Sequence, residues 1–207
     1  MNLFISGIGT NVGKTIVSAI LTESLKADYW KPVQSGVLEV KDSDTVKSLI
    51  SNSKTIIHPE IYLLNEPLSP HFAAKLDGIE INIEKINLPQ TDNHLIIEGA
   101  GGLLVPLNQT NFVIDIAKKM ECQIVLVVSN YLGCINHTLL SINYLKANNF
   151  KIHSLVFNGD FENEVKEPII KDLPDTNILH IPFIKSINKD LILNISESIN
   201  HFLSLRH

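Results

Sequence analysis

Near the start of the chain, the glycine-rich stretch from Gly7 to Thr15 constrains the fold more than any other part of the sequence. It follows the phosphate-binding pattern G-x4-G-K-[ST] with one residue added to the loop, because its letters are GIGTNVGKT. The apolar residues 2–6 precede it, and a mixture of apolar and polar residues from 16 to 25 follows it. Strand, loop and helix in this order surround a polyphosphate with backbone N–H groups and the positive end of a helix. We therefore predict a nucleotide-binding site at this loop.

Lys14 and Thr15 are the residues of the loop that carry the expected chemistry. A lysine at this position reaches the β- and γ-phosphates of a nucleotide, and the hydroxyl beside it ligates Mg²⁺. An ordinary glycine turn could contain the same two residues by coincidence. The place of the loop directly after the first expected strand favours the phosphate-binding interpretation.

The apolar residues lie in short blocks, such as Leu95–Ile97 and Ile124–Val128, that are bounded by polar residues. Blocks of this length suit strands that are buried on both faces of a parallel sheet. Hydrophobic residues make up 44% of the 207 residues, which is enough for a sizeable core. We predict one α/β domain over residues 1–207 that resembles the P-loop NTPases, with a mainly parallel β-sheet flanked by helices on both faces.

Bulk properties exclude several classes of protein. The formal net charge of −5 argues against general nucleic-acid binding, which requires a basic surface. No apolar run approaches the length of a transmembrane helix, and the first residues lack the pattern of a signal peptide. Cys122 and Cys134 are too few for a disulfide framework and fit a reducing compartment. We expect a cytoplasmic enzyme or switch with no nucleic-acid or membrane partner.

The apolar periodicity predicts strands that alternate with helices along the chain. The expected strands cover residues 2–6, 28–33, 94–98, 124–129, 152–157 and 178–181. The expected helices cover residues 16–25, 71–76, 83–88, 111–120, 135–147 and 187–205, and another short one begins near residues 42–44. Residues 53–70 are expected to be irregular. Ligands of such a fold bind at the carboxyl ends of its strands.

Three further charged side chains stand where this fold would bring them near a bound triphosphate. Lys31, in KPVQSG at the end of the second expected strand, could offset charge on a substrate or be an ordinary surface lysine. Asp44, with Asp42 close by, could ligate Mg²⁺ or cap a helix. Glu98, in EGAGG at the end of a buried strand, has the position of a Walker-B carboxylate.

The segment from Leu132 to His137, LGCINH, follows another expected strand and begins a helix. Its free backbone N–H groups could hold a carboxylate. Cys134 and His137 could suggest a nucleophile or a metal pair, but two ligands do not make a zinc site. We expect Cys134 to act as a small buried apolar group.

Taken together, these stretches resemble the dethiobiotin synthetase family, and the matches run in order from Gly7 to about Pro182. The family's loop, G-T-D-T-x-V-G-K-T, is similar to residues 7–15. The other matches are K-P-V-x-S-G at residues 31–36, Ser-Asp at 43–44, S-P-H at 69–71, E-G-A-G-G at 98–102, L-G-C-I-N-H at 132–137 and an N-x-[DE]-like turn at 158–160.

The resemblance implies an ATP-dependent ring closure in biotin synthesis. The diamine 7,8-diaminononanoate would take up CO₂, supplied as bicarbonate, to form a carbamate whose oxygen attacks the γ-phosphate of MgATP. This step would make a carbamic–phosphoric mixed anhydride, from which the second amine expels phosphate to close the ureido ring of dethiobiotin. The resemblance also implies a ligase that uses ATP as co-substrate and Mg²⁺ as cofactor, and a homodimer with the substrate across its interface.

The resemblance assigns roles to individual residues as well. The residues expected to act in catalysis are Lys14, Lys31, Thr10 and Ser35. Those expected to hold Mg²⁺ are Thr15, Asp44 and Glu98. Those expected to contact the nucleotide are Thr10, Asn11, Val12, Gly13, Lys14, Thr15, Ile16, Glu98, Pro182 and, at the base, Asn158. Those expected to contact the substrate are Lys31, Ser35, Gly101, Gly102 and, from the partner chain, Leu132, Gly133, Cys134, Ile135 and Asn136.

The chain departs from the family's pattern at Asn11, where the family frequently has an acidic residue, and in two further places. Ile8 and Gly9 stand where the family has Thr-Asp, and the residues after Pro182 do not resemble the family's base-binding segment. The departure after Pro182 leaves the choice among ATP, GTP and CTP open.

Three alternatives share the expected fold. A regulatory ATPase switch of the ParA or MinD class has a signature lysine at the position of Gly9. This chain lacks that lysine, which argues against a switch. Residues 132–137 argue against a related amidoligase-like enzyme that acts on cobalamin precursors. A nucleotide-binding scaffold without chemistry would not be expected to keep Lys14, Thr15, Lys31, Asp44 and Glu98.

Overall fold

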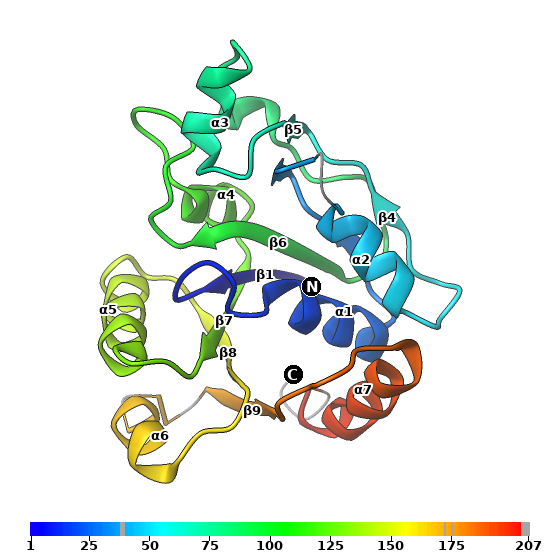
Figure 1. Cartoon of the computed structure of the whole chain (residues 1–207), viewed down its shortest axis with the longest axis vertical. Coiled ribbons are helices and arrows are strands. Elements are labelled where there is room, and N and C mark those ends of the chain that lie inside the picture. The colour runs from blue at the N-terminus through cyan, green and yellow to red at the C-terminus, as the bar shows by residue number, and fades with distance from the viewer. Residues whose placement is uncertain (38–39, 172, 175, 204–207) are drawn as a thin grey trace.

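The computed structural model describes residues 1–37, 40–171, 173–174 and 176–203 (Figure 1). Its strands are β1 (Asn2–Gly7), β2 (Asp28–Trp30), β3 (Val33–Ser35), β4 (Ile57–His58), β5 (Tyr62–Leu64), β6 (Leu95–Gly102), β7 (Gln123–Ser129), β8 (Ile152–Asn158) and β9 (Asn177–Ile181). Its helices are α1 (Lys14–Leu25), α2 (Asp42–Leu49), α3 (Pro70–Leu76), α4 (Val113–Lys119), α5 (Cys134–Ala147), α6 (Asn163–Ile170) and α7 (Lys189–Leu203), with a 3₁₀ turn η1 (Ile83–Lys85). The end of the helix expected at residues 187–205 lies outside the described residues.

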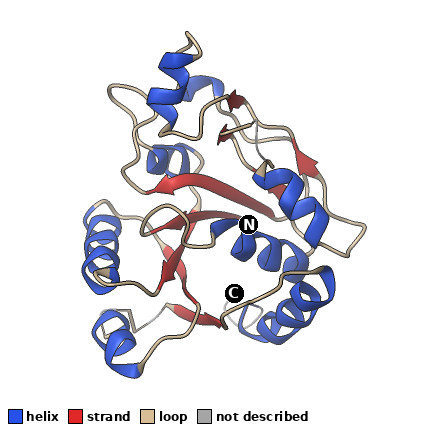
Figure 2. Cartoon of the chain, in the orientation of Figure 1, coloured by secondary structure: helices blue, strands red, loops and turns tan. Residues whose placement is uncertain are grey.

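A parallel sheet runs through the centre of the molecule (Figure 2). Its strands lie in the order β4-β2-β6-β1-β7-β8-β9, and all the pairs between these named strands are parallel. β3 and β5 form a second, two-stranded parallel sheet. The predicted α/β fold with a mainly parallel sheet is therefore confirmed. Within the part of the chain that the structure describes, no helix is long and apolar enough to cross a membrane.

The central strands are buried on both faces, as their short apolar blocks predicted. In β1, Leu3 and Ile5 pack into one core cluster with residues of α1, α2 and α7, whereas Phe4 packs into the other. That other cluster includes residues of α4, α5 and α6, so the helices cover the two faces of the sheet (Figure 1). Each fully buried aliphatic or phenyl side chain contributes roughly 1.5–3 kcal/mol. The hydrophobic effect on both faces therefore holds the sheet between two helical layers.

The segment expected to be irregular, residues 53–70, contains two short strands, so that expectation is wrong in part. β4 pairs with β2, and β5 pairs with β3, which continues the chain beyond Pro32. Strands of two or three residues are too short to show a periodicity. Their pairing depends on partners far away in the chain, so no local pattern in the sequence indicates them.

A buried carboxylate explains why β4 joins the sheet. Asp28 accepts a hydrogen bond from the backbone N–H of Ile56 (2.9 Å), and it contacts Nε2 of His58 (3.1 Å). Thr91 and Asn93 donate to the same carboxylate. Burial alone would raise the pKa of Asp28, but these hydrogen bonds outweigh it and lower that pKa. The charged form of Asp28 therefore ties the starts of β2, β4 and β6 together.

β6 and α6 also differ from the prediction. β6 continues through the glycines to Gly102, and its register with β1 shifts between the partners of Ile5 and Gly7. α6 was not predicted, and it contains Pro168, which disrupts a helical sequence pattern.

The order of the strands places the site. β1 lies between β6 and β7, and β6 lies between β1 and β2. The carboxyl ends of β1, β2 and β6 are thus neighbours. β1 leads into the glycine loop, β2 leads to Lys31, and β6 ends with the glycines that follow Glu98. Parallel α/β sheets bind ligands at this edge, where the strand order changes direction.

Candidate active site

A cavity of about 870 Å³ opens at this edge of the sheet. It is lined by the glycine loop, the start of α1, the start of α3 with the residues just before it, and the end of β6. Its other described lining residues are Lys31, Gln34, Ser35, Gly36, Val40, Asp42 and Val105. Of the residues predicted to bind nucleotide, metal or substrate, it is lined by Thr10, Asn11, Gly13, Lys14, Thr15, Ile16, Lys31, Ser35, Glu98 and Gly101.

The glycine loop is held in shape by backbone conformation and one side chain from another strand. Gly13 has φ +92°, a conformation that only glycine adopts without strain. A Cβ atom at this position would lie 2.0 Å from Nδ2 of Asn158. That same Nδ2 atom donates to the carbonyl of Val12 (2.9 Å), so the end of β8 supports the loop. Lys14 folds back over the loop, with Nζ 3.3 Å from the carbonyl oxygen of Gly9.

Three oxygen-bearing side chains converge at the start of α1. The hydroxyl of Thr15 lies 3.0 Å from Oδ1 of Asp42 and 2.9 Å from Oε1 of Glu98. Glu98 is almost completely buried. A hydroxyl and two carboxylates form a set of hard oxygen donors, which is the chemistry that Mg²⁺ prefers, with phosphate oxygens and waters as its other ligands. Within the described residues, no group of three or more His, Cys, Asp and Glu could hold a metal by itself.

Lys31 completes this cluster from the end of β2. Its ammonium group pairs with Asp42 and lies 3.3 Å from Oε1 of Glu98. Burial would lower the pKa of Lys31, but the charges of Glu98 and Asp42 outweigh it and raise that pKa. Lys31 is therefore a fixed positive charge inside the cavity, and the alternative of an ordinary surface lysine is wrong.

The pKa of Lys14 is lowered, in contrast to that of Lys31. Burial lowers its pKa, and the neighbouring charge of Lys31 lowers it further, against the raising effects of Glu98 and Asp42. Two ammonium groups thus share one cavity with two carboxylates. A polyanion that enters the cavity would favour the charged form of both lysines.

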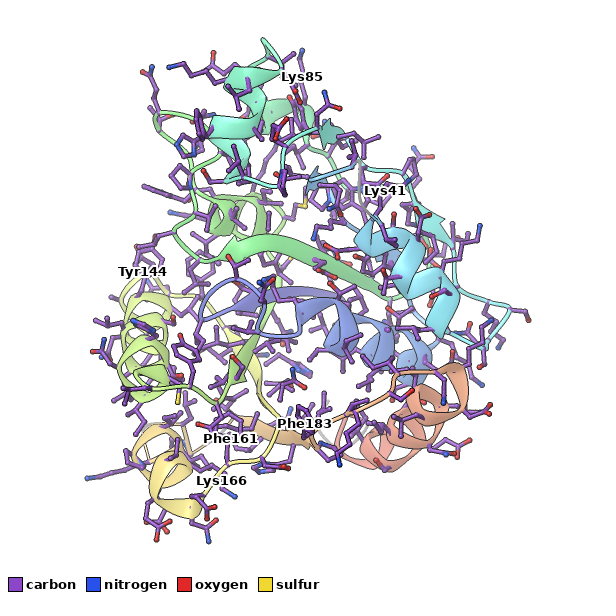
Figure 3. All side chains as sticks on the ribbon, in the orientation of Figure 1. Lys41, Lys85, Tyr144, Phe161, Lys166 and Phe183 are labelled. Carbon is purple, nitrogen blue, oxygen red and sulfur yellow. The ribbon has the colours of Figure 1, made fainter. Side chains whose placement is uncertain are left out.

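The structure places the two aspartates differently with respect to the cavity. Asp44 does not line the cavity: more than half of its side chain is exposed, and its Oδ2 lies 3.8 Å from Nζ of Lys41. Lys41 precedes α2 and is labelled in Figure 3. Asp42, the first residue of α2, occupies the position beside Thr15 that was expected for Asp44. A signal for this was present, because Asp42, Val46 and Leu49 have the i, i+4, i+7 spacing of one helix face, and Val46 and Leu49 are buried.

Two more residues that sequence reasoning missed support this cluster. Oε1 of Gln34 accepts from the backbone N–H of Asp42 (3.2 Å) and so fixes the first turn of α2. The hydroxyl of Tyr29 donates to Oε2 of Glu98 (2.9 Å). Neither contact has a sequence signal, because each joins elements whose proximity only the fold decides.

Ser35 and Thr10 lie on the walls of the cavity. The Oγ atom of Ser35 is buried and has no hydrogen-bond partner within the described protein. An unpaired buried hydroxyl costs free energy, so a polar ligand in the cavity would be favoured beside it. Thr10 is exposed at the tip of the glycine loop.

Several predicted residues lie outside this cavity. Val12 is buried beneath the loop, and Gly102 lines a smaller cavity of about 360 Å³ on the side of α5. Asn158 is the last residue of β8, and Pro182 directly follows β9. The two residues are close because Asn158 pairs with Ile181, the last residue of β9. Phe183, the next residue, is 65% exposed (Figure 3).

Residues 132–136 also lie away from the large cavity, at the start of α5. Leu132 is fully exposed, Gly133 has φ +106° before the first turn, and Cys134 is buried and free. The hydroxyl of Tyr131 lies 2.7 Å from Nδ1 of His137 beside this turn. Within a single chain, the turn before α5 is therefore open to solvent at Leu132 and does not contact the large cavity.

Comparisons with known proteins agree first on the class of protein. The sequence model of the AAA domain family AAA_26 matches residues 1–190, so the chain belongs to that family of P-loop domains. A plasmid partition protein from Borrelia burgdorferi has a similar fold, with a TM-score of 0.57, 14% identity and coverage of 98% of this chain and 97% of that one. The septum site-determining protein MinD from Pyrococcus horikoshii, complexed with Mg-ADP, gives a TM-score of 0.52 at 14% identity, over 99% and 98% of the two chains. Likeness at this identity concerns the fold alone.

Full-length relatives then identify the family more narrowly. The ATP-dependent dethiobiotin synthetase BioD of Cytophaga hutchinsonii is 47% identical over 190 residues, which cover 91% of this chain and 92% of the relative. That of Christiangramia forsetii is 49% identical over 176 residues, which cover 85% and 84%. The chain therefore belongs to the ATP-dependent dethiobiotin synthetase family, as its motifs predicted.

Two of the three glycines of the loop provide a test of its geometry. Gly13→Ala forces a Cβ atom into Asn158 at a positive φ, so we expect it to lower the free energy of unfolding by about 1–3 kcal/mol. Gly9→Ala is the matched control, because a Cβ atom there meets nothing within 4 Å, and we expect a change of less than about 0.5 kcal/mol. Urea unfolding without nucleotide measures both. Equal stability of the two variants would contradict the described loop geometry.

Proposed function

We propose that this chain is an ATP-dependent dethiobiotin synthetase that converts 7,8-diaminononanoate, CO₂ and ATP into dethiobiotin, ADP and phosphate. The observation that carries the proposal is the convergence of Lys14, Thr15, Lys31, Asp42 and Glu98 on one cavity, in a chain of the dethiobiotin synthetase family. Such a site has cations and oxygen ligands but no obvious nucleophile, which suits a reaction in which the substrates supply the reacting atoms.

The glycine loop and Lys14 would hold the phosphates of ATP. The backbone N–H groups at the start of α1 have no carbonyl partners in the helix, so they can donate to phosphate oxygens. Lys14 would leave the carbonyl of Gly9 and bridge the β- and γ-phosphates. Thr15, Asp42 and Glu98 would hold Mg²⁺, directly or through water. Mg²⁺ would neutralise charge on the transferring phosphoryl group.

Lys31 would act where negative charge develops. A carbamate formed on one amine of the substrate is an anion, and its oxygen must approach the γ-phosphate, which is also anionic. The buried ammonium of Lys31 reduces this repulsion and stabilises the transferring phosphoryl group. After phosphoryl transfer, the second amine attacks the carbamoyl carbon, the C–O bond to phosphate breaks, and the ureido ring closes. Ser35, Thr10 and Gly101 would position the diamine at the cavity wall.

We further propose that two copies of the chain form the complete site. Leu132 to Asn136 cannot serve the cavity of their own chain from their position at the start of α5, yet their N–H groups suit the carboxylate tail of the diamine. The exposed Leu104, Leu132 and Leu140, with the smaller cavity between β6 and α5, support a homodimer on this side of the sheet.

Asn158, Pro182 and the exposed Phe183 would form the base site at the ends of β8 and β9. The two free cysteines support a reducing compartment, and we place the reaction in the cytoplasm.

The reaction itself is the first test. Purified protein with 7,8-diaminononanoate, bicarbonate, MgCl₂ and ATP is expected to form dethiobiotin, detected by mass spectrometry, only when both the diamine and ATP are present. GTP and CTP in place of ATP test the base preference. If no nucleotide supports product formation while the protein binds MgATP and hydrolyses it in response to a protein partner, the regulatory switch replaces this proposal.

The two lysines are expected to fail in different ways. Lys14→Ala loses the phosphate contact, so both nucleotide affinity and turnover fall, whereas Lys31→Ala keeps nucleotide affinity and loses turnover by about 100-fold or more. Lys41→Ala, which changes a partly exposed lysine outside the cavity, is the control and keeps turnover. Steady-state kinetics and ADP titrations separate the effects. Near-normal turnover of Lys31→Ala would remove Lys31 from the mechanism.

The two aspartates give a paired test of the metal ligands. Asp42→Asn removes a carboxylate beside Thr15, so the Mg²⁺ concentration needed for half-maximal turnover should rise more than about tenfold. Asp44→Asn breaks only an exposed pair with Lys41, worth about 0–1 kcal/mol at most, and should leave the Mg²⁺ dependence unchanged. A result in the reverse order would return the metal site to Asp44.

A further inference from the structure

Tyr29 makes a contact that the reaction described above does not use. It lies on β2, next to β6, and its backbone is paired with Ile96, two residues before Glu98. Its hydroxyl donates to Oε2 of Glu98 at 2.9 Å, and both side chains are almost wholly buried. A phenolic O–H that lies beside a carboxylate oxygen donates its hydrogen bond to that oxygen.

The two oxygens of Glu98 therefore have different partners. Oε1 faces the cavity, where Thr15 donates to it and Lys31 lies 3.3 Å away. Oε2 faces the protein, where Tyr29 donates to it. The terminal torsion of a glutamate side chain is soft, so a carboxylate without such a partner can turn about its last bond. The hydroxyl of Tyr29 sets the plane of the carboxylate and so decides which oxygen is presented to a ligand.

We propose that Tyr29 is a positioning residue for the metal site, and that it acts by holding Glu98 with one oxygen toward the cation. This inference rests on the proposed function, in which Glu98 helps to hold Mg²⁺. Carboxylates that bind metals are commonly oriented by a second hydrogen bond, and loss of that bond typically lowers metal affinity about 10–100-fold.

The packing of Tyr29 is separable from its hydrogen bond. Its ring belongs to the core cluster on the α1 side of the sheet, where a phenylalanine ring fills the same space. The next residue, Trp30, points to the other face and donates from Nε1 to the carbonyl of Pro59 (3.0 Å), which holds β2 independently. Tyr29→Phe therefore removes the hydroxyl and leaves the strand in place.

The test compares Tyr29→Phe with Tyr62→Phe. Tyr62 also has a hydrogen-bonded hydroxyl, with Asn82 as partner, but it lies on β5 outside the cavity lining. Binding of Mn²⁺, a spectroscopic substitute for Mg²⁺, is measured by electron paramagnetic resonance on the ADP-bound protein, and ADP affinity is measured in EDTA. For Tyr29→Phe we expect Mn²⁺ affinity to fall about tenfold or more with unchanged metal-free ADP affinity, and turnover to recover as Mg²⁺ is raised. Tyr62→Phe should match the wild type in all three.

Glu98→Gln separates failure of this inference from failure of the proposed function. If Glu98→Gln loses Mn²⁺ affinity and Tyr29→Phe does not, the metal site stands and the role of Tyr29 is wrong. If Glu98→Gln binds Mn²⁺ like the wild type, Glu98 is not a ligand, and both the metal assignment and the role of Tyr29 fall. A loss of metal-free ADP affinity equal to the loss of Mn²⁺ affinity in Tyr29→Phe would indicate a general structural role and would also overturn the inference.

A second measurement needs no variant of Tyr29. The chain has 4 tyrosines, so protein labelled with 3-fluorotyrosine gives a simple ¹⁹F spectrum. Addition of Mg²⁺ to the ADP-bound protein should shift one resonance, and Glu98→Gln should abolish that shift. A spectrum in which no resonance responds to Mg²⁺ would overturn the inference.

Discussion

The interaction on which the cavity depends is the pairing of one buried ammonium group with two carboxylates. Lys31, from the end of β2, lies between Asp42 at the start of α2 and Glu98 on β6. A charge buried without a partner costs several kcal/mol, and removing one member of a buried pair typically destabilises a protein by about 3–5 kcal/mol. The same three side chains that would serve the reaction therefore also join α2 to the central sheet. The glycine loop, Gln34 and Tyr29 then fix the geometry around them.

Much of this arrangement can be predicted from short, contiguous stretches of the sequence. The glycine loop, the buried blocks of β6 and β7, and the exposed start of α5 are contiguous stretches whose patterns do not depend on distant partners. Glu98 was predicted because it ends a buried strand, and Lys31 because it follows one. For both residues, an apolar strand pattern directly before the side chain is sufficient to place that side chain at the carboxyl edge of a parallel sheet.

The remainder depends on how elements are oriented and paired. Asp42 and Asp44 are two residues apart, so they point to nearly opposite sides of α2, and motif spacing alone did not show that Asp42 is the one that lines the cavity. Tyr29 reaches Glu98 only because β6 lies beside β2, although 65 or so residues separate the strands in sequence. β4 and β5 are short strands whose pairing is decided by Asp28 and by the path of the chain after Pro32. These features require the topology, which no short window of sequence contains.

The position of β6 also has a consequence for how the chain folds during synthesis. β1 and β2, the first two strands of the main sheet, are not neighbours, because β6 lies between them. When the ribosome has made the first ninety residues, the two strands that pair with β1, which are β6 and β7, have not yet been synthesised. The glycine loop after β1 is then not supported by a formed sheet. Contacts over such sequence distances slow folding, because the entropy of closing a long loop is lost before the contacts form. The nascent amino-terminal half therefore exposes an apolar strand until residues 95–102 and 123–129 emerge, and this is the interval in which a chaperone would have the most surface to bind.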